Sequence, residues 1–276
     1  MEEYPLCGHV KAHKHGTMPN GHQRYRCPAC HQTFCESFDS LYYRRHVSPE
    51  HIRQVLQAHS EGSSLRGISR TTKHADNTVV SIVRAASQKA QLVHNGEVQA
   101  VQTEEVSADE MWSFVKKQKQ CSTQDRERGD CWIGLSLACC SGFMLAARVD
   151  RHTDALIEQL VINTEDKTVC KQFNTDDWGG YERVLPPEIW HHIGKDRTQR
   201  LERTNGIVRQ QTGRWHRRQN KFGKGWKQTK VTTRLVVSDF NWIWQHSRLK
   251  TTAAQRAGLT TRSWNWHDIA TYPTLI

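Results

Sequence analysis

The sequence lacks an apolar segment at its N-terminus of the kind that directs secretion. The sequence has nine cysteines, an odd number, so they cannot all be paired in disulfides within the chain. Together these two features argue against a secreted, disulfide-stabilised protein. We therefore expect a reduced protein of the cytoplasm.

An uninterrupted membrane span is lacking as well. The run that is long enough to raise the question contains Ser141, Gly142 and Arg148. The Ser-Gly pair indicates a turn between two segments of strand length. We predict a core β-hairpin over residues 131–149 and no membrane partner.

Acidic residues are scarce relative to basic ones, with 28 Asp and Glu against 39 Lys and Arg, a net charge of +11. The imbalance is concentrated between Lys195 and Arg234, where 13 basic residues accompany two acidic ones, Asp196 and Glu202. The local excess, 13 − 2 = +11, equals that of the whole chain. Such a concentration favours a polyanionic partner.

Part of this tract, residues 214–222, mixes cations with aromatic and amide side chains. A solvated face is the usual explanation of an isolated basic run. The mixture instead favours nucleic acid, because cations bind phosphates and aromatic rings stack on bases. We predict four DNA contacts here: Arg214, Arg217, Arg218 and Lys221.

Three carboxylates that are far apart in the sequence suit a single metal site. Asp109 and Asp176 lie at the ends of β-rich apolar runs, and Glu202 lies in a stretch that is typical of a helix. Magnesium prefers oxygen ligands, and phosphoryl transfer with two metal ions needs carboxylates from several elements. On a helix, Glu202, Asn205 and Arg209 share one face, so that a metal and a phosphate could be bound together.

Each of the first two carboxylates has an acidic neighbour. Asp109 precedes Glu110, and Asp176 precedes Asp177. Adjacent residues of a strand point to opposite faces of the sheet, so only one of each pair can face the site. The apolar pattern does not decide between them. A solvated surface position is the simpler explanation for any one of these acids.

Cysteines near the N-terminus suggest a zinc module over residues 1–40. Cys27 and Cys30 have the spacing of one half of a zinc ribbon. Cys7 is a third thiolate, and the fourth ligand is open among His9, His13 and His15. The alternative is a degraded module that no longer binds zinc. Cys35 has no assigned role.

Residues 47–90 predict three short helices. Ser48 and Pro49 form a helix start, and apolar residues then recur at helical spacing. Two short helices and a polar turn before a third helix suit a helix-turn-helix, although a simple three-helix packing module fits the pattern equally well. Four residues are candidates to face the DNA groove: Asn77, Thr78, Ser81 and Arg84.

The remaining segments complete a predicted α/β domain over residues 105–260. A polar linker is expected at 91–104, followed by a strand at 106–115 and the hairpin already described. Further elements are a helix at 154–161, strands at 168–175 and 189–193, and helices from Thr198 and from Arg234. Trp242 and Trp244 are expected to pack in the core. Residues 261–276 form a C-terminal tail without an assigned structure.

Three blocks of sequence resemble the DDE transposases of the insertion sequence one family. They are Ala-Asp-Glu-Met-Trp-Ser-Phe-Val at 108–115, Asn-Thr-Asp-Asp-Trp at 174–178 and Thr-Gln-Arg-Leu-Glu-Arg-Thr-Asn at 198–205. Arg209 follows the last block, and the resemblance extends from the N-terminal cysteines to residues 253–259. The family has Cys-Pro-x-Cys near its N-terminus, whereas Tyr4 stands at the first of those positions here.

The resemblance implies a ribonuclease-H-like catalytic domain preceded by a small zinc-ribbon-like module and a helix-turn-helix. It implies that Asp109, Asp176 and Glu202 bind two Mg²⁺ ions, with Mn²⁺ as an alternative, and that Arg209 positions a phosphate. It also favours Asp109 over Glu110, and Asp176 over its neighbour, as metal ligands.

The implied activity is transposition. Double-stranded DNA is the expected partner, both as terminal inverted repeats and as target, and the enzyme would release 3′-hydroxyl ends and join them to target DNA. A homodimer associated with the nucleoid is expected. Two alternatives are a nuclease of the same fold without strand transfer, and a catalytically inactive DNA-binding regulator.

Overall fold

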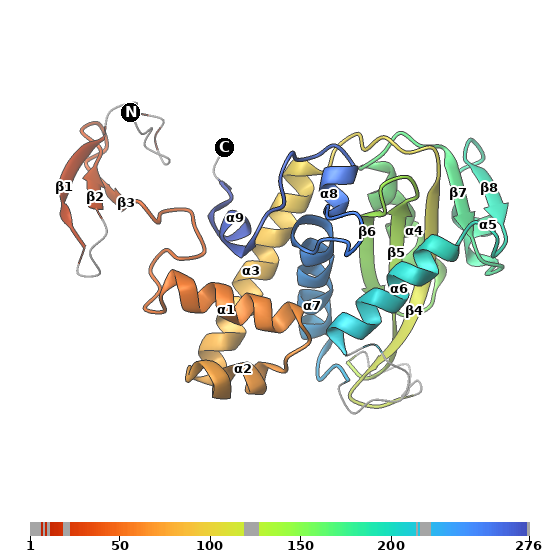
Figure 1. The fold of residues 1–276 in the computed structure, drawn as a ribbon, viewed down its shortest axis with the longest axis horizontal. Coiled ribbons are helices and arrows are strands. Elements are labelled where there is room, and N and C mark those ends of the chain that lie inside the picture. The colour runs from red at the N-terminus through yellow and green to blue at the C-terminus, as the bar shows by residue number, and fades with distance from the viewer. Residues whose placement is uncertain are drawn as a thin grey trace.

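The computed structural model describes residues 7, 9, 12–18, 23–118, 127–213, 215 and 222–274. A small N-terminal sheet stands beside a group of three helices, and these lie next to a larger mixed sheet with helices on both faces (Figure 1). No helix in the described ranges is long and apolar enough to cross a membrane.

The N-terminal sheet has three short antiparallel strands, β1 (His13–Thr17), β2 (Gln23–Arg26) and β3 (Thr33–Cys35). Its core is small. Cys27 and Phe34 are buried, and Tyr25 stacks on Phe34 with ring centroids 5.3 Å apart. So little apolar surface cannot stabilise a module of this size by itself, and small modules of this kind usually need a bound metal or a disulfide.

The three helices are α1 (Pro49–Ser60), α2 (Leu65–Thr72) and α3 (Asp76–Glu97). The predicted start of the first helix is confirmed, because the Ser48 side chain accepts a hydrogen bond from the backbone N–H of His51. Ser64 caps α2 in the same way. Our prediction of a linker from residue 91 is wrong for its first seven residues, which are helical. They stay helical because Val93 and His94 pack inward, and His94 Nε2 lies 2.8 Å from the carbonyl oxygen of Leu145.

The larger sheet has the strand order β6-β5-β4-β7-β8. Its strands are β4 (Val106–Val115), β5 (Gly129–Ala138), β6 (Phe143–Asp150), β7 (Gln172–Thr175) and β8 (Trp190–Ile193). The first three are antiparallel, whereas β7 pairs with β4 and β8 with β7 in parallel. The predictions of a mixed α/β sheet and of a hairpin are confirmed.

Helices cover both faces of this sheet. They are α4 (Asp154–Glu165), α5 (Gly180–Val184) and α6 (Gln199–Thr212). Gly134 contacts Leu156 and Leu160 of α4, and this glycine lies opposite Glu110 in the β4–β5 pair. Asn205 of α6 instead contacts Asp109. Because adjacent residues alternate, α4 and α6 lie on opposite faces.

Helix α7 (Trp226–Ser238) continues into a π-helical turn, η1 (Asp239–Ile243). We predicted a helix beginning at Arg234, which is wrong, because the helix begins eight residues earlier. Asn241 explains the irregular turn: its amide exchanges two 2.9 Å hydrogen bonds with the backbone of Met144 and so covers the edge of β6. Trp242 is buried and Trp244 stacks on Phe240, which confirms that both tryptophans pack.

The C-terminal segment is folded onto the N-terminal helices. It contains α8 (Ala253–Arg256) and α9 (Trp266–Thr271). Tyr272 donates a 2.8 Å hydrogen bond to Glu97 at the end of α3, and the Thr274 hydroxyl lies 3.1 Å from Lys89 Nζ. One continuous apolar core joins α1, α3, α7, α9 and the larger sheet.

Candidate active site and metal centres

Asp109 lies within β4 on the face of the sheet that α6 covers. Its Oδ1 accepts a 2.7 Å hydrogen bond from the backbone N–H of Glu110. Its Oδ2 accepts a 2.8 Å hydrogen bond from Nδ2 of Asn205. Both oxygens are therefore fixed in direction by rigid elements of the fold, as a metal ligand requires.

Asp176 directly follows β7, which runs parallel to β4. Val106 lies opposite Phe173 in this pair, so the strands lead Asp109 and Asp176 to the same end of the pairing. Oδ1 of Asp176 lies 3.3 Å from the backbone nitrogen of Trp178, which donates to it. The two carboxylates that are 67 positions apart in sequence are thus neighbours in the fold.

The electrostatics of Asp109 reflect this proximity. Burial raises the pKa of its carboxyl group to about 6, and the negative charges of Glu110 and Asp176 act in the same direction. The backbone hydrogen bond from Glu110 and the positive charge of Arg209 act in the opposite direction. Crowded carboxylates of this kind are stabilised when a cation joins them.

Helix α6 carries the third predicted carboxylate, Glu202, and the predicted phosphate-positioning residue, Arg209. Glu202, Asn205 and Arg209 lie on one face of this helix, as predicted from their spacing. Glu202 is exposed, and within the described residues its oxygens do not join those of Asp109 and Asp176 in a group within 4.8 Å. Oδ1 of Asn205 is buried and has no hydrogen-bond partner in the described part of the chain.

The acidic neighbours of the first two carboxylates have different surroundings. Glu110 is buried on the opposite face of the sheet, where the Tyr181 hydroxyl donates a hydrogen bond to its Oε1. Asp177 is exposed, whereas Asp176 is half-buried. Asp109 and Asp176 are thus the members of each pair that lie together.

A stack of three aromatic rings lies on the face of the sheet to which Glu110 points. The His152 ring lies between Trp132 and Trp178, with centroid distances of 4.1 and 4.0 Å. Nε2 of His152 is 3.6 Å from Oε2 of Glu110, an ion pair when the imidazole is protonated. Because Trp178 also holds Asp176 through its backbone N–H, the stack supports the loop that carries the second carboxylate.

The sequence reasoning missed His152 and Tyr181. The Trp-Gly-Gly-Tyr segment directly after Asp177 is a signal for Tyr181, because a Cβ at Gly180 would overlap the Trp178 ring at 2.4 Å. No local pattern marks His152, whose partners lie on three other elements.

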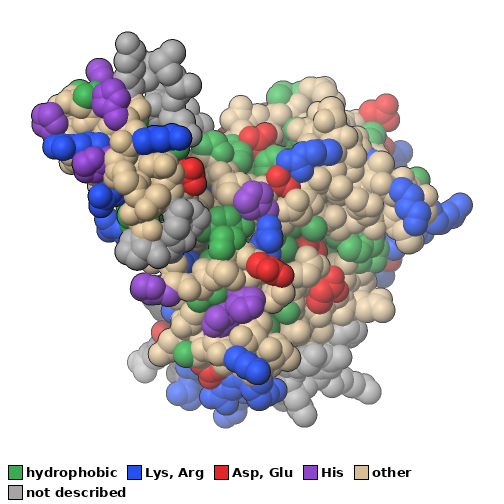
Figure 2. Space-filling view, turned by 60° about the vertical axis from the view of Figure 1, so that its left-hand side comes forward, with side chains coloured by type: hydrophobic (Ala, Val, Ile, Leu, Met, Phe, Trp, Pro, Cys, Tyr) green, Lys and Arg blue, Asp and Glu red, His purple; other side chains and the backbone are tan. Residues whose placement is uncertain are grey.

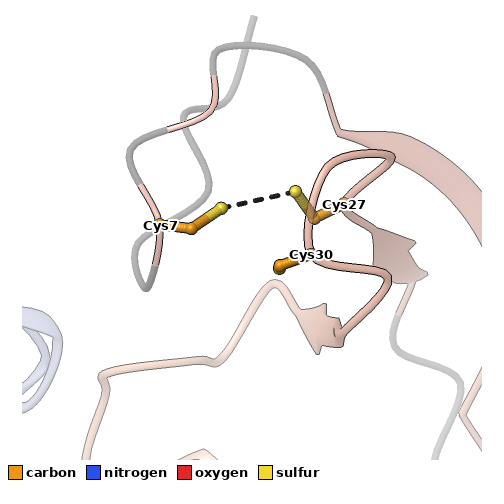
Figure 3. Close-up of side chains that lie close together, drawn as sticks. All are labelled: Cys7, Cys27 and Cys30. Atoms are coloured by element: carbon orange, nitrogen blue, oxygen red, sulfur yellow. Dashed lines mark hydrogen bonds between the residues drawn. The ribbon is translucent and has the colours of Figure 1, made fainter.

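The three predicted cysteines come together in the N-terminal module (Figure 3). The sulfurs of Cys7, Cys27 and Cys30 lie within 4.8 Å of one another, and Cys7 Sγ is 3.4 Å from Cys27 Sγ. Burial acts to raise the pKa of the Cys27 thiol, but backbone N–H groups of Cys30 and Ala29 donate to its sulfur, and its pKa is lowered on balance. These three sulfurs could provide three of the four ligands of a tetrahedral zinc site.

A fourth ligand is not supplied by the histidines that we considered. Among the described residues His9, His13 and His15 do not join the cysteine group and are exposed. Tyr4 lies outside the described residues. Cys35 is buried apart from this group, with its sulfur 3.3 Å from the Ser37 hydroxyl.

Basic side chains gather on α2, at the lower end of the molecule in Figures 1 and 2. Arg66, Arg70 and Lys73 are exposed there, and α2 has no acidic residue in its first turn. The predicted groove-facing residues lie on the first turns of the adjoining α3. Three of them, Asn77, Ser81 and Arg84, are exposed, and Thr78 is half-buried. The other four predicted DNA contacts, Arg214, Arg217, Arg218 and Lys221, lie outside the described residues.

Comparisons with known proteins identify relatives of parts of the chain. The model of the IS1 transposase family matches residues 105–238. The insertion element iso-IS1N protein InsA of Shigella dysenteriae is 29% identical over 85 residues, which cover 30% of this chain and 89% of that protein.

Two solved structures have a partial likeness. The catalytic core domain of BIV integrase has 11% sequence identity and a TM-score of 0.38, over 56% of this chain and 93% of that one. A simian T-cell lymphotropic virus intasome in complex with PP2A regulatory subunit B56 gamma has 12% identity and a TM-score of 0.39, over 74% of each chain.

Proposed function

Residues 105–238 form a domain of the IS1 transposase family, and on this premise we propose that the chain cleaves and joins DNA at the ends of its own element. It would bind the terminal inverted repeats, release 3′-hydroxyl ends and transfer them to target DNA. The observation that carries this proposal is the convergence of Asp109, Asp176 and the Asn205–Arg209 face of α6.

The donor set of this site suits Mg²⁺, with Mn²⁺ as an alternative. Asp109 and Asp176 would bind the metal ions, and Glu202, one turn before Asn205 on the same helix face, would complete the site. The raised pKa of Asp109 and the unpartnered Oδ1 of Asn205 both favour a cation here. Two such ions, when bound, stabilise the attacking and leaving oxygens of a phosphodiester.

The side chains of the chain itself have positioning roles. Asn205 holds Asp109 in its orientation, and Trp178 does the same for Asp176 through its backbone N–H. Arg209, one helical turn beyond Asn205, would contact a phosphate of the DNA strand. No covalent link between protein and DNA is needed, because the 3′-hydroxyl is the nucleophile of the joining step.

Recognition of the DNA ends would fall to the N-terminal modules, residues 1–40 and 47–90. The exposed basic side chains of α2 and the first turns of α3 suit a helix-turn-helix, whose second helix enters the major groove. The cysteine cluster would bind Zn²⁺. Two ends must be brought together, so we propose a homodimer that acts at the nucleoid.

The test uses a labelled duplex carrying the inverted repeat that flanks the gene, incubated with Mg²⁺. Wild type is compared with Glu202→Gln and with Glu158→Gln, an exposed glutamate of α4 on the opposite face of the sheet. Cleavage and joining by wild type and Glu158→Gln alone are expected.

Other outcomes would select the alternatives. Cleaved 3′-hydroxyl ends that never join to target would indicate a nuclease. Specific binding without any cut would indicate a DNA-binding regulator. Equal activity of Glu202→Gln and wild type would remove Glu202 from the metal site.

A further inference from the structure

A cavity of about 640 Å³ lies where the three-helix group meets the catalytic sheet. This volume is within the range of sites that bind a small organic group. On one side it is lined by α2 and α3, through Leu65, Arg66 and Val80. On the other side it is lined by Ser113 of β4, by Trp215 and Phe222, and by α7.

The cavity lies on the same face of the sheet as the proposed metal ligands. Ser113 and Asp109 are four residues apart on β4, so both point to the α6 face and lie about 13 Å apart along the strand. Helix α6 leads from Arg209 towards Trp215 at the cavity. DNA bound along α6 would therefore pass both.

The three-helix group is held tightly against this end of α6. Gly62, at the turn between α1 and α2, has a φ of +80°, and a Cβ there would lie 2.5 Å from the carbonyl oxygen of Gln211. The cavity is thus a fixed feature between the basic surface of α2 and the proposed active site.

The lining of the cavity combines aromatic rings and one amide with hydroxyl and charged side chains, among them Asp76, whose Oδ2 lies 3.8 Å from Nε of Arg66. Phe222 stacks on Phe114 with centroids 4.9 Å apart, and Lys224 Nζ lies 4.2 Å from the centre of the Phe222 ring. Gln228 lines the cavity from α7, and both Nε2 and Oε1 of its amide are buried without a hydrogen-bond partner in the described part of the chain. A buried amide in this state is unfavourable unless a ligand supplies a donor and an acceptor.

We propose that this cavity binds one unpaired base of the DNA end, an inference that rests on the proposed function. A purine or pyrimidine presents a donor and an acceptor side by side, which the Gln228 amide can pair with as glutamine does with adenine. Its flat ring would lie against Trp215 and the edge of Phe222, because the faces of Phe222 are covered by Phe114 and Lys224. Lys224 at the lining would contact a phosphate next to the base, and Arg66 would contact the other while it keeps its exposed ion pair with Asp76.

A purely apolar ligand would leave the Gln228 amide unsatisfied, and a phosphate would meet its carbonyl oxygen and the aromatic rings. Withdrawal of one base from the duplex would open the DNA next to the strand to be cut. The distance of about 13 Å corresponds to about four base steps of duplex, so the base in question lies within the terminal positions of the repeat.

The experiment measures equilibrium binding of the full chain to the inverted-repeat duplex without Mg²⁺, so that no cutting occurs. A series of duplexes lacks a single base in turn at each terminal position on each strand. Wild type is compared with Gln228→Leu, which keeps the bulk but removes the amide, and with Gln228→Glu, which keeps the shape but replaces the N–H donor with a second acceptor. Lys227→Ala, at an exposed neighbouring position of α7, is the control for loss of a cation.

Gln228→Leu is expected to weaken binding of the intact duplex about tenfold, and to have no effect on the duplex that lacks the bound base. Lys227→Ala should weaken both duplexes equally. If Gln228→Leu and Gln228→Glu bind every duplex as wild type does, or lose affinity for all of them equally, the cavity does not bind a base.

The wild type distinguishes this failure from failure of the proposed function. Cleavage of the intact duplex by wild type in Mg²⁺, combined with no selective effect at any position, would overturn the base site alone. Absence of specific binding and of cleavage by wild type would overturn both proposals. Thermal unfolding of each variant verifies that it is folded.

Discussion

The cysteine cluster and the carboxylate cluster hold their proposed ligand atoms in different ways. Cys27 and Cys30 share one turn between two short strands, and few apolar residues surround them. Asp109 and Asp176 come from strands of a sheet whose core extends through most of the chain. The first cluster is local and weakly supported, and the second is non-local and strongly supported.

The difference teaches which part of the molecule depends on a metal for its fold. In a small module with little core, the binding free energy of zinc is also folding free energy. The sheet is stabilised by apolar burial and does not need a metal to form, so its carboxylates can be kept close together at an electrostatic cost. Loss of metal should therefore unfold the N-terminal module, whereas it should only inactivate the sheet.

The largest expected effect is at Asp109. Asp109→Asn should lower DNA cleavage roughly a thousandfold or more, because a ligand that is held by both α6 and the backbone loses its charge. Binding of the DNA end should stay within about twofold of wild type. Asp177→Asn, at the exposed neighbour of Asp176, should cleave normally. Normal cleavage by Asp109→Asn would remove Asp109 from the metal site, and loss of cleavage in Asp177→Asn would favour Asp177 over Asp176 as the ligand.

Removal of zinc should have the next largest effect. We expect one zinc per chain by metal analysis, and Cys27→Ser should lose it, with faster proteolysis within residues 7–40 and at least about tenfold weaker binding of the DNA end. Thermal unfolding of the sheet should not change. Cys35→Ser, at a buried cysteine outside the cluster, is the control and should keep its zinc. If the N-terminal module of the wild type is fully folded without zinc, it does not depend on a metal for its fold, and the contrast between the two clusters is wrong.

The stack around His152 should have an intermediate effect. His152→Ala removes the ring between Trp132 and Trp178, and we expect cleavage to fall by about tenfold to a hundredfold as the Asp176 loop loses support. His152→Phe keeps a flat ring but not the contact with Glu110, and it separates stacking from charge. Measuring the Mg²⁺ dependence of cleavage checks the prediction: a positioning role raises the Mg²⁺ concentration needed, whereas an unchanged dependence in both variants would exclude it.

The smallest expected effect is on stability as a function of pH. The folded-state pKa of Asp109, about 6, lies above its ordinary value of 3.8, so without metal its ionisation destabilises the fold by up to about 3 kcal/mol. The fold is more stable at low pH, where the Asp109 carboxyl is protonated, and this contribution is lost as the pH rises through 6. Mg²⁺ binds the ionised form, so it should raise the Tm more at pH 8 than at pH 5.

Asp109→Asn isolates this effect. The carboxyl of Asp239, whose pKa is raised to about 7 by burial and by the charge of Glu61, changes stability in the same direction in both proteins. The difference in Tm between wild type and Asp109→Asn, measured without metal from pH 5 to pH 8, therefore reports Asp109 alone. A difference that does not change with pH would mean that this carboxyl is not protonated near pH 6.

Much of the catalytic sheet could be predicted from local patterns. The strand predicted at 106–115 matches β4 residue for residue, and the turn at Ser141-Gly142 was marked by its composition. The family resemblance was carried by residues that lie in the sheet and α6, and it is confirmed by the family model. These features were predictable because they depend on alternation and turn chemistry within a few neighbouring residues.

Other features could not be predicted because distant contacts override the local signal. The His-Asn-Gly sequence at 94–96 suggested a break, yet α3 continues because His94 packs against β6. Helix α7 begins early, at Trp226, since its first turns pack against the three-helix group and line the cavity between them. The His152 stack joins β5, the end of β6 and the loop after β7, and no single segment contains its pattern.

The sequence by itself determined which residue types each proposed cluster contains: thiolates at zinc spacing, and carboxylates from separate elements. It misplaced Asp109, which lies within β4 and not at the end of its apolar run, because the strand continues to Val115. The apolar pattern left open which acid of each pair belongs to the proposed site; the family resemblance favoured Asp109 and Asp176, and the tertiary structure places these two side by side. Alternation along β4 guarantees that Asp109 and Glu110 point to opposite faces, but it does not say which face α6 will cover. The packing of Asn205 against Asp109, and of Tyr181 against Glu110, makes that choice.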